Sequence, residues 1–327
     1  MVLVCGGAGF IGSHMCALLR REGIEHAAFD SLEKGHKEAL QSTELIGGDL
    51  RDRASIKAAL ASGRFTQVMH FAASIEVGES VREPSYFWNN NFIGTWNLLE
   101  EMREAGIQQF VFSSTAAVYG EPQQIPIPEN HPKAPTSPYG ETKLAVERMA
   151  ASYDSAYGLK SVVLRYFNAC GSDSTGILGE DHRPETHLIP CALRAAAGKA
   201  DALTLFGTDY DTPDGTCLRD YVHVEDLASA HLLALKHLAA GGESRTYNLG
   251  SGSGYSVKEV IDACQAASGR EIPVKISGRR AGDPARLIAD SSAIRNDWGW
   301  QPRWTELVDM ASHAWMWMER NPEGYKD

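Results

Sequence analysis

A glycine-rich turn at the start of the chain constrains the fold more strongly than any other segment. Gly6, Gly9 and Gly12 lie between the short apolar run Val2–Cys5 and the segment Phe10–Arg21, whose apolar residues recur at helical spacing. The order strand, glycine turn, helix is typical of a site where backbone approaches a pyrophosphate closely at a helix N-terminus. The spacing is GxxGxxG rather than GxGxxG, and a glycine turn alone also serves ordinary tight connections. Its context decides between the two interpretations.

That context includes an acidic residue at the end of the next apolar run. Asp30 follows His26–Phe29 at the distance from the glycines where dinucleotide-binding folds place a carboxylate. A carboxylate there accepts hydrogen bonds from both hydroxyls of an adenosine ribose and repels a 2′-phosphate. The sequence therefore predicts NAD rather than NADP as the cofactor.

A tyrosine and a lysine four residues apart form the second informative motif. Pro138 and Glu141 suit the first turn of a helix, so we expect a helix that begins near Ser137 and places Tyr139 and Lys143 on one face. The ammonium and a positively charged nicotinamide together favour the ionised phenol. Lowering the phenol pKa from ~10 to about 7 needs about 4 kcal/mol and yields a general base. An isolated YxxxK pair also arises by chance, and the upstream nucleotide motif favours the catalytic interpretation.

Between these motifs, the apolar run Phe110–Phe112 breaks into the hydroxyl residues Ser113, Ser114 and Thr115. The carboxyl ends of parallel strands face the ligand crevice of an open sheet. We expect one of these hydroxyls to bridge the substrate and Tyr139, and the other two to cap a loop or helix.

Strand and helix patterns alternate as far as residue 167, which predicts an α/β fold of the Rossmann type, with a doubly wound parallel sheet. Further strands are expected over Leu45–Gly48, Gln67–Phe71, Gln109–Phe112 and Ser161–Arg165. We assign residues 1–167 to an NAD-binding domain and residues 168–327 to a smaller, mixed α/β substrate domain. In the second part we expect a polar loop over 171–185 and helices near 188–198, 225–239, 256–268 and 304–319.

The composition excludes several classes of function. A net charge of −11 argues against nucleic acid and anionic membranes as partners. Because no signal-peptide pattern or apolar run of about 18 residues is present, we expect a cytoplasmic protein. The six cysteines form no CxxC pair and the 11 histidines no HExxH spacing, so neither a disulfide framework nor a metal site is predicted. For His70, His187 and His223 we expect packing or hydrogen-bonding roles.

The two motifs belong to a series of blocks that extends through nearly the whole chain. The blocks are GGAGFIGSH, HFAA, VGES, NNNFIGT, SSTAAVYGE, SPYGETK, LRYFNACG, FGTDYDTPDGTCLRDYVHV, YNLGSG and RRAGDPA. Through them the chain resembles the extended short-chain dehydrogenase/reductases and, within these, the UDP-glucose 4-epimerases. The resemblance implies an NAD enzyme that oxidises a UDP-hexose at C4 and returns the hydride to the other face. It also implies a homodimer formed through helices near 84–105 and 139–157, and segments near 215–240 that return to the NAD domain.

The resemblance assigns roles to individual residues. Tyr139, Lys143 and Thr115 would be catalytic, with Tyr139 as phenolate removing the 4-hydroxyl proton directly or through Thr115. The cofactor site would comprise Gly6, Gly9, Phe10, Ile11, Gly12, Asp30, Asp49, Leu50, Phe71, Ala72, Ala73, Asn90, Ser113, Tyr139, Lys143 and Tyr166.

On the substrate side, Arg219 and Arg280 would hold the UDP phosphates, for which planar guanidinium groups are well suited. Asn168 would contact the diphosphate and Asp283 the uridine ribose. The whole UDP-sugar site would comprise Thr115, Asn168, Leu188, Phe206, Arg219, Tyr221, Arg280 and Asp283.

The chain departs from the family pattern at three positions. Ile75 stands where some members have a lysine near the nicotinamide, and His187 where an asparagine commonly contacts the substrate. Leu287 stands where some members have an aromatic residue that narrows the sugar pocket. The breadth of substrates, including N-acetylated sugars, is therefore left open.

Three alternatives stay open at this point. A 4-epimerase of UDP-GlcNAc, UDP-glucuronate or a UDP-pentose would share most of these residues. A nucleotide-sugar dehydratase typically has an Asp-Glu pair where this chain has Ala116 and Ala117, which argues against it. A non-catalytic NAD-binding regulator would have no need of Thr115, Tyr139 and Lys143 together.

Overall fold

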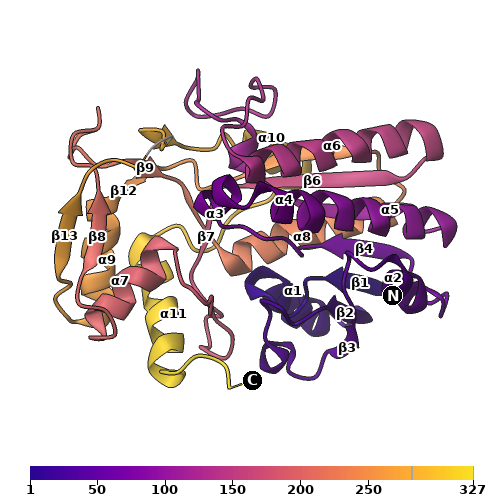
Figure 1. Ribbon diagram of the computed structural model, residues 1–327, viewed down its shortest axis with the longest axis horizontal. Helices are drawn as coiled ribbons and strands as arrows, with labels where there is room; N and C mark the ends of the chain where they lie inside the picture. The colour runs from indigo at the N-terminus through magenta and orange to yellow at the C-terminus, as the bar shows by residue number, and fades with distance from the viewer. Residues whose placement is uncertain (281–282, 327) are drawn as a thin grey trace.

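A seven-stranded sheet forms the larger part of the molecule, in a computed structural model that describes residues 1–280 and 283–326 (Figure 1). The strand order is β11-β6-β5-β4-β1-β2-β3, and every neighbouring pair is parallel. This confirms the predicted doubly wound sheet. The strands are β1 (Val2–Cys5), β2 (His26–Asp30), β3 (Glu44–Gly47), β4 (Gln67–His70), β5 (Gln109–Thr115), β6 (Lys160–Tyr166) and β11 (Arg245–Leu249).

Helices cover both faces of this sheet, and each face has its own apolar core. Val2 and Val4 of β1 belong to the core under α1 and α8, whereas Leu3 and Cys5 belong to the core under α2, α5 and α6. This alternation explains why the strand is apolar throughout, as expected for a sheet buried on both sides. The helices are α1 (Phe10–Arg21), α8 (Val224–Ala239), α2 (Arg53–Leu60), α5 (Gly94–Glu104) and α6 (Pro138–Tyr157).

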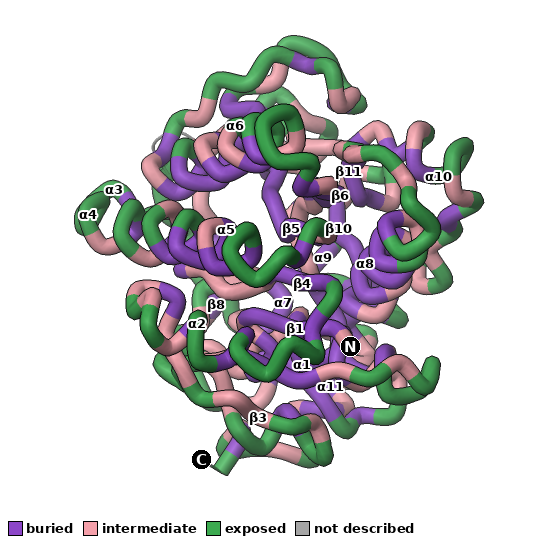
Figure 2. The backbone as a smooth tube through the Cα atoms, turned by 90° about the vertical axis from the view of Figure 1, so that its right-hand side faces the viewer, coloured by how far each residue is buried: buried purple, intermediate pink, exposed green. Residues whose placement is uncertain are grey.

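Short helical segments link the sheet's middle strands on the α5 and α6 side. They are α3 (Val77–Arg82), α4 (Pro84–Phe87) and a π-helical turn over Trp88–Ile93 that continues into α5. Figure 2 shows the central strands of the sheet buried between helices whose outer faces and connecting loops are exposed, whereas the edge strand β3 is partly exposed. Among the described residues, no helix is both long enough and apolar enough to cross a lipid bilayer.

The smaller part of the molecule lies beside the carboxyl ends of the sheet strands and has a core of its own (Figure 1). Its helices are α7 (Leu188–Ala196), α9 (Val257–Ser268) and α11 (Leu307–Arg320), as the sequence predicted, and residues 171–185 form a loop. Its strands form two short pairs, β7 (Asn168–Cys170) with β10 (Tyr221–His223) and β8 (Leu203–Phe206) with β13 (Val274–Ser277). They also form a three-stranded sheet, in which β9 (Leu218–Arg219) lies between β12 (Tyr255–Ser256) and β14 (Arg286–Leu287).

The segment that returns to the large sheet overlaps the expected 215–240 and extends beyond it. It begins with α8, which packs on α1, and extends through β11, which pairs with β6. Residues 218–219 instead belong to the small β9 sheet. The strand β11 escaped sequence analysis because its five residues, RTYNL, begin with exposed and half-buried positions. The helix α10 (Ser292–Trp298) was also not predicted.

Candidate active site

The glycine turn between β1 and α1 is shaped by contacts that only glycine allows. Gly6 has a φ of +77°, and a Cβ atom there would lie 2.4 Å from the main-chain nitrogen of Ala72. A Cβ atom on Gly12 would lie 2.0 Å from the main-chain oxygen of Gly6. At Gly9, by contrast, it would approach only the oxygen of Gly6, at 3.4 Å. Gly6 and Gly12 therefore allow close packing of the turn, while Gly9 leaves room at the helix N-terminus.

The N-terminus of α1 has the features of an anion site. Gly9 precedes the helix and provides no side-chain cap, and Phe10 and Ile11 are its first two residues. The first main-chain N–H groups of a helix have no acceptor within the helix. Together with the helix dipole, these groups suit a pyrophosphate. The turn therefore leaves main-chain N–H groups at the start of α1 without a side-chain partner, which is compatible with the predicted pyrophosphate site.

Asp30 lies at the end of β2, directly beside this turn. Its Oδ2 accepts a hydrogen bond of 2.9 Å from the N–H of Ala8, and its Oδ1 one of 2.9 Å from the N–H of Leu32. Burial raises the pKa of this carboxyl group. The two main-chain donors fix the carboxylate beside the glycines, and each oxygen can still accept from a ribose hydroxyl.

The other residues assigned to the cofactor follow neighbouring strands of the sheet. Phe71, Ala72 and Ala73 follow β4, where the N–H groups of Phe71 and Ala72 donate to the main-chain oxygen of Cys5, at 2.8 and 3.2 Å. After β3, Asp49 is held by Arg51, and Leu50 is buried. The amide of Asn90 donates to the hydroxyl of Ser74, at 3.0 Å. The strand ends thus bring together segments that are far apart in the sequence.

Tyr139 and Lys143 lie on the first turns of α6, one turn apart. The helix begins at Pro138, and the hydroxyl of Ser137 caps it by accepting from the N–H of Gly140, at 3.2 Å. This confirms the predicted helix start. Both side chains are buried, and Lys143 Nζ donates to the main-chain oxygen of Ser113, at 2.9 Å. The motif from the middle of the chain therefore meets the carboxyl end of β5.

The three hydroxyls at this strand end have different partners. The hydroxyl of Ser113 lies 3.0 Å from Nε2 of His231, and that of Ser114 donates to Glu147, at 2.6 Å. Thr115 Oγ1 accepts from the N–H of Ala117, at 3.2 Å, and the interaction of its hydroxyl with Tyr139 lowers the pKa of that phenol. Only Thr115 is therefore placed beside Tyr139, and it caps a short 3₁₀ turn as well. Tyr166 pairs with Thr115 in the β5–β6 register, and burial, followed by the influence of Tyr139, raises the pKa of its phenol.

Burial dominates the ionisation of both catalytic candidates. It raises the pKa of Tyr139 to about 12, against the hydrogen bond from Thr115, which lowers it. Burial also lowers the pKa of Lys143 to about 7, against the charge of Glu147, which raises it. The chain alone therefore keeps Tyr139 protonated at neutral pH. The positive nicotinamide that the sequence analysis invoked is required, and the phenolate itself stays a prediction.

Sequence analysis missed a buried ionic network directly behind this site. Arg165 of β6 binds both oxygens of Glu147, with Nε···Oε1 of 2.9 Å and Nη2···Oε2 of 2.6 Å. Its Nη1 also donates to the hydroxyl of Tyr119, at 2.8 Å. Glu147 follows Lys143 by one turn and accepts from Ser114, so the network fixes α6 against the ends of β5 and β6. In the sequence, the only sign of this network was Arg165, a charged residue within an otherwise apolar strand.

The substrate-side residues gather around β9 and β7. Arg219 Nη2 donates to Asp283 Oδ1, at 2.6 Å, so the two residues assigned to the phosphates and the ribose form an ion pair. The Arg280 guanidinium lies 4.0 Å from the centre of the Phe206 ring. Asn168 Nδ2 donates to the main-chain oxygen of Asp220, at 2.9 Å. Elsewhere, Leu188 begins α7 and Tyr221 is buried in β10.

An apolar cluster joins the substrate side to the catalytic helix. Its buried members include Tyr119 and Leu144, and Phe167 and Leu287 pack against them. Leu144 follows Lys143 on α6, and Leu287 pairs with Arg219 in the small sheet. Leu287 therefore lies where substrate-side strands approach α6. Through this cluster, the smaller part of the molecule packs against the helix that carries Tyr139 and Lys143.

The six cysteines are unpaired thiols, five of them buried, as predicted. His187 has the hydrogen-bonding role expected of it, with its Nδ1 atom 3.2 Å from Glu185 Oε1. His187 lies beside Glu180, His182 and Glu185, and one possible metal-ligand atom from each lies within 4.8 Å of the others. The spacing ExHxxExH matched no familiar metal motif, so sequence analysis expected no metal site there.

A parallel sheet with a glycine turn, an acidic residue after β2 and a buried Tyr-Lys pair at the end of β5 defines a dinucleotide-binding protein with a proton-transfer group. Comparison with known proteins agrees with this class. The chain matches the NAD dependent epimerase/dehydratase family over residues 2–250. It is 50% identical over 324 residues to the UDP-glucose 4-epimerase of Halalkalibacterium halodurans, with coverage of 99% of this chain and 97% of the relative.

Solved structures give the same result. The UDP-glucose 4-epimerase from Brucella ovis in complex with NAD is 46% identical, with a TM-score of 0.94 and coverage of 96% of this chain and 97% of that one. The enzyme from Bifidobacterium longum in complex with NAD⁺ and UDP is 38% identical, with a TM-score of 0.94 and coverage of 99% of both chains. The chain therefore belongs to the NAD dependent epimerase/dehydratase family and, within it, to the UDP-glucose 4-epimerases.

Proposed function

We propose that this protein interconverts UDP-glucose and UDP-galactose by NAD-dependent epimerisation at C4. The observation that carries the proposal is the buried arrangement of Tyr139, Lys143 and Thr115 at the end of β5. The full-length similarity to UDP-glucose 4-epimerases supports the same activity. In terms of enzyme class, the protein would be an NAD-dependent isomerase. We also propose the cytoplasmic location that the composition led us to expect.

The chain's own residues supply binding and proton transfer. Main-chain N–H groups at the start of α1 would hold the pyrophosphate of NAD, and Asp30 the adenosine ribose. When bound, NAD supplies the acceptor for the C4 hydride and the donor for its return. Tyr139 would take the 4-hydroxyl proton, directly or through Thr115, and give it back after the sugar has presented its other face.

The substrate side supports a nucleotide diphosphate as the handle of the substrate. Arg219 and Arg280 carry the two guanidinium groups proposed for the phosphates, and Asp283 already orients Arg219. Guanidinium groups match phosphate oxygens in geometry and keep their charge at all relevant pH values. A UDP group held by both arginines would leave the hexose free to turn between the two hydride transfers.

The decisive experiment incubates the purified protein, without added NAD, with UDP-glucose and measures UDP-galactose by chromatography. Tyr139→Phe should lower kcat about 10²- to 10⁴-fold while bound NAD and UDP affinity stay near wild type. Tyr157→Phe is the matched control, because Tyr157 lies exposed at the other end of the same helix. Near-normal turnover by Tyr139→Phe would refute the assignment.

The same assay decides among the alternative sugars. UDP-GlcNAc, UDP-glucuronate and UDP-xylose are tested in parallel, because Leu287 and His187 leave the sugar side open. Epimerisation of UDP-xylose or UDP-glucuronate in preference to UDP-glucose would assign the protein to another substrate. A product that has lost water would instead indicate a dehydratase.

We also infer that the protein forms a homodimer through the α5 and α6 side of the sheet. Large apolar side chains stay exposed there: Trp88 at 38%, Ile93 at 38%, Trp96 at 41% and Tyr157 at 51%. They lie on the two regions, 84–105 and 139–157, for which the family resemblance implies an interface. Such a group of exposed aromatic residues is typical of a protein–protein contact.

A further inference from the structure

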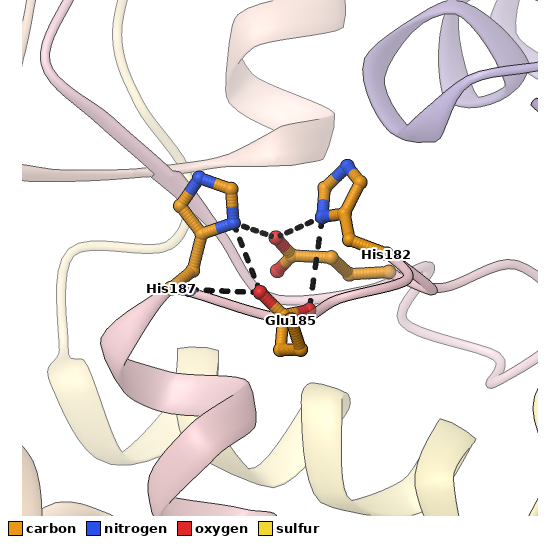
Figure 3. Close-up of side chains that lie close together, drawn as sticks. His182, Glu185 and His187 are labelled. Atoms are coloured by element: carbon orange, nitrogen blue, oxygen red, sulfur yellow. Dashed lines mark hydrogen bonds and ion pairs between the residues drawn. The ribbon is translucent and has the colours of Figure 1, made fainter. Parts of the chain in front are cut away.

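Four side chains of one short loop converge between the two parts of the molecule (Figure 3). Glu180, His182, Glu185 and His187 all belong to the segment between β7 and α7. Their side chains turn toward one another, and the Nδ1 atom of each imidazole faces the carboxylate oxygens. Among the described residues, no other group of His, Cys, Asp and Glu has this arrangement.

The four distances between the imidazole nitrogens and the carboxylate oxygens are close to those found around a small four-coordinate cation, and all four candidate ligand atoms lie within 4.8 Å of one another. His182 Nδ1 lies 3.1 Å from Glu180 Oε1 and 3.6 Å from Glu185 Oε2. His187 Nδ1 lies 2.8 Å from Glu180 Oε1 and 3.2 Å from Glu185 Oε1. A tetrahedral Zn²⁺ with ligands at about 2.0–2.1 Å has edges of roughly 3.3 Å between its ligand atoms. Small adjustments would therefore place all four ligands around one ion.

Burial makes a positive partner necessary. The side chains of Glu180 and Glu185 are only 5% and 6% exposed, and the two carboxylates lie within reach of the same imidazole nitrogens. Two buried carboxylates at this separation repel each other and lose their hydration. The Nδ1 atom of His182 is also buried and makes no hydrogen bond of regular geometry with any described group. A cation between the four groups would satisfy both requirements.

We propose that Glu180, His182, Glu185 and His187 bind a divalent transition-metal ion, with Zn²⁺ as the ion that fits best. Two imidazole nitrogens and two carboxylate oxygens are all ligands that Zn²⁺ accepts, and four protein ligands close the coordination sphere. Because no position is left for water or substrate, the site is structural rather than catalytic. Mg²⁺ and Ca²⁺ prefer all-oxygen sites with more ligands.

The position of the loop indicates what the ion would stabilise. The His182 ring lies edge-on to Phe10, the first residue of α1, with 6.4 Å between ring centres. Asp181 accepts from His36 through its main-chain oxygen, at 3.1 Å. His187 immediately precedes α7. The metal site would therefore link the glycine-turn helix of the large sheet to the first helix of the smaller part.

The test uses the full-length protein, dialysed against a chelator and then titrated with Zn²⁺ alone. We expect one tightly bound Zn²⁺ per chain by elemental analysis after gel filtration, and a rise in Tm on adding the ion. His182→Gln and Glu185→Gln should each weaken Zn²⁺ binding more than about tenfold and abolish the rise in Tm. His237→Gln is the matched control, because His237 is a partly exposed histidine near the end of α8, away from the cluster.

A second measurement holds even if the variants fold poorly. Co²⁺ added to the chelator-treated wild type should give the intense visible absorption of a tetrahedral site, and Zn²⁺ should remove it. Failure of the wild type to retain one equivalent of Zn²⁺ overturns the proposal, since protons on both imidazoles would then balance the carboxylates. Equal Zn²⁺ binding by folded His182→Gln overturns it as well.

Discussion

Lys143 Nζ donates a hydrogen bond of 2.9 Å to the main-chain oxygen of Ser113, so the ammonium ties α6 to the carboxyl end of β5. The sequence analysis paired this ammonium with the Tyr139 phenol and assigned Lys143 to the cofactor site. In the structure, Lys143 also holds α6 in position against β5 through this hydrogen bond. The acceptor is a main-chain oxygen, so no substitution of Ser113 removes it. The charge and the position of the lysine can therefore be separated only by changing Lys143 itself.

Lys143→Met keeps the buried aliphatic chain but removes the ammonium. We expect kcat to fall about 10²- to 10⁴-fold, because the charge that favours the Tyr139 phenolate is lost. Bound NAD should also decrease, since Lys143 is assigned to the cofactor. Steady-state kinetics and NAD content after gel filtration measure the two effects. Lys57→Met, on the exposed side of α2, is the control, and equal turnover by both variants would contradict the role of Lys143.

The glycines of the first turn should respond differently to alanine. Gly12→Ala places a Cβ atom 2.0 Å from the main-chain oxygen of Gly6, so we expect a clearly lower Tm. Gly9→Ala approaches that oxygen only at 3.4 Å, and we expect a near-normal Tm with bound NAD reduced more than about tenfold. Gly47→Ala, with no neighbour within 4 Å, is the control for both measurements. Full NAD content in Gly9→Ala would show that the pyrophosphate does not lie there.

The elements that sequence analysis located are those with local signals. Alternating apolar runs predicted the sheet, and Ser137 with Pro138 predicted the start of α6, because capping and periodicity depend on adjacent residues. The Glu147–Arg165 pair could not be predicted, since it requires knowing that α6 packs against β6. In the sequence, Glu147 and Arg165 each look like an ordinary charged residue.

The Arg219–Asp283 ion pair on the substrate side also depends on tertiary packing, so it could not be predicted from the sequence. Arg219 and Asp283 lie 64 residues apart, and β9 and β14 bring them close only in the folded chain. The cluster that includes His187 was missed for a different reason. Its four residues are close in sequence, but they lie in a loop. Without a regular helix or turn, the spacing of residues in the sequence does not predict which way their side chains point.

The exposed aromatic residues on the α5 side make the homodimer testable. Trp96→Glu places a charge within the proposed interface, which we expect to shift the protein from dimer to monomer in light scattering. Ile276→Glu is the control, because Ile276 is 66% exposed on β13 in the smaller part. A wild-type protein that is monomeric at micromolar concentration, or a Trp96→Glu dimer as stable as wild type, would contradict the proposed interface.

His231 gives the fold a predictable dependence on pH. It is buried beneath β5, where Nδ1 lies 2.8 Å from the main-chain oxygen of Leu227 and Nε2 3.0 Å from the Ser113 hydroxyl. Nδ1 therefore carries the proton, and Nε2 accepts from Ser113. Burial lowers the pKa of His231 to about 4, against the Leu227 hydrogen bond, which raises it. The imidazole is thus neutral in the folded protein at pH 5 and mostly charged in the unfolded chain.

Between pH 6.5 and 4 the unfolded chain binds a proton at His231 that the folded protein does not, so the free energy of unfolding falls as pH falls. From pH 7 to pH 5 this single group should lower it by about 2 kcal/mol. In His231→Gln that contribution disappears, so its stability should fall by about 2 kcal/mol less than that of wild type over the same range. Urea unfolding at the two pH values measures the difference, with His237→Gln as the control. Identical pH dependence in wild type and His231→Gln would show that this imidazole is charged in the fold, and that the Ser113 hydroxyl at the end of β5 is held in some other way.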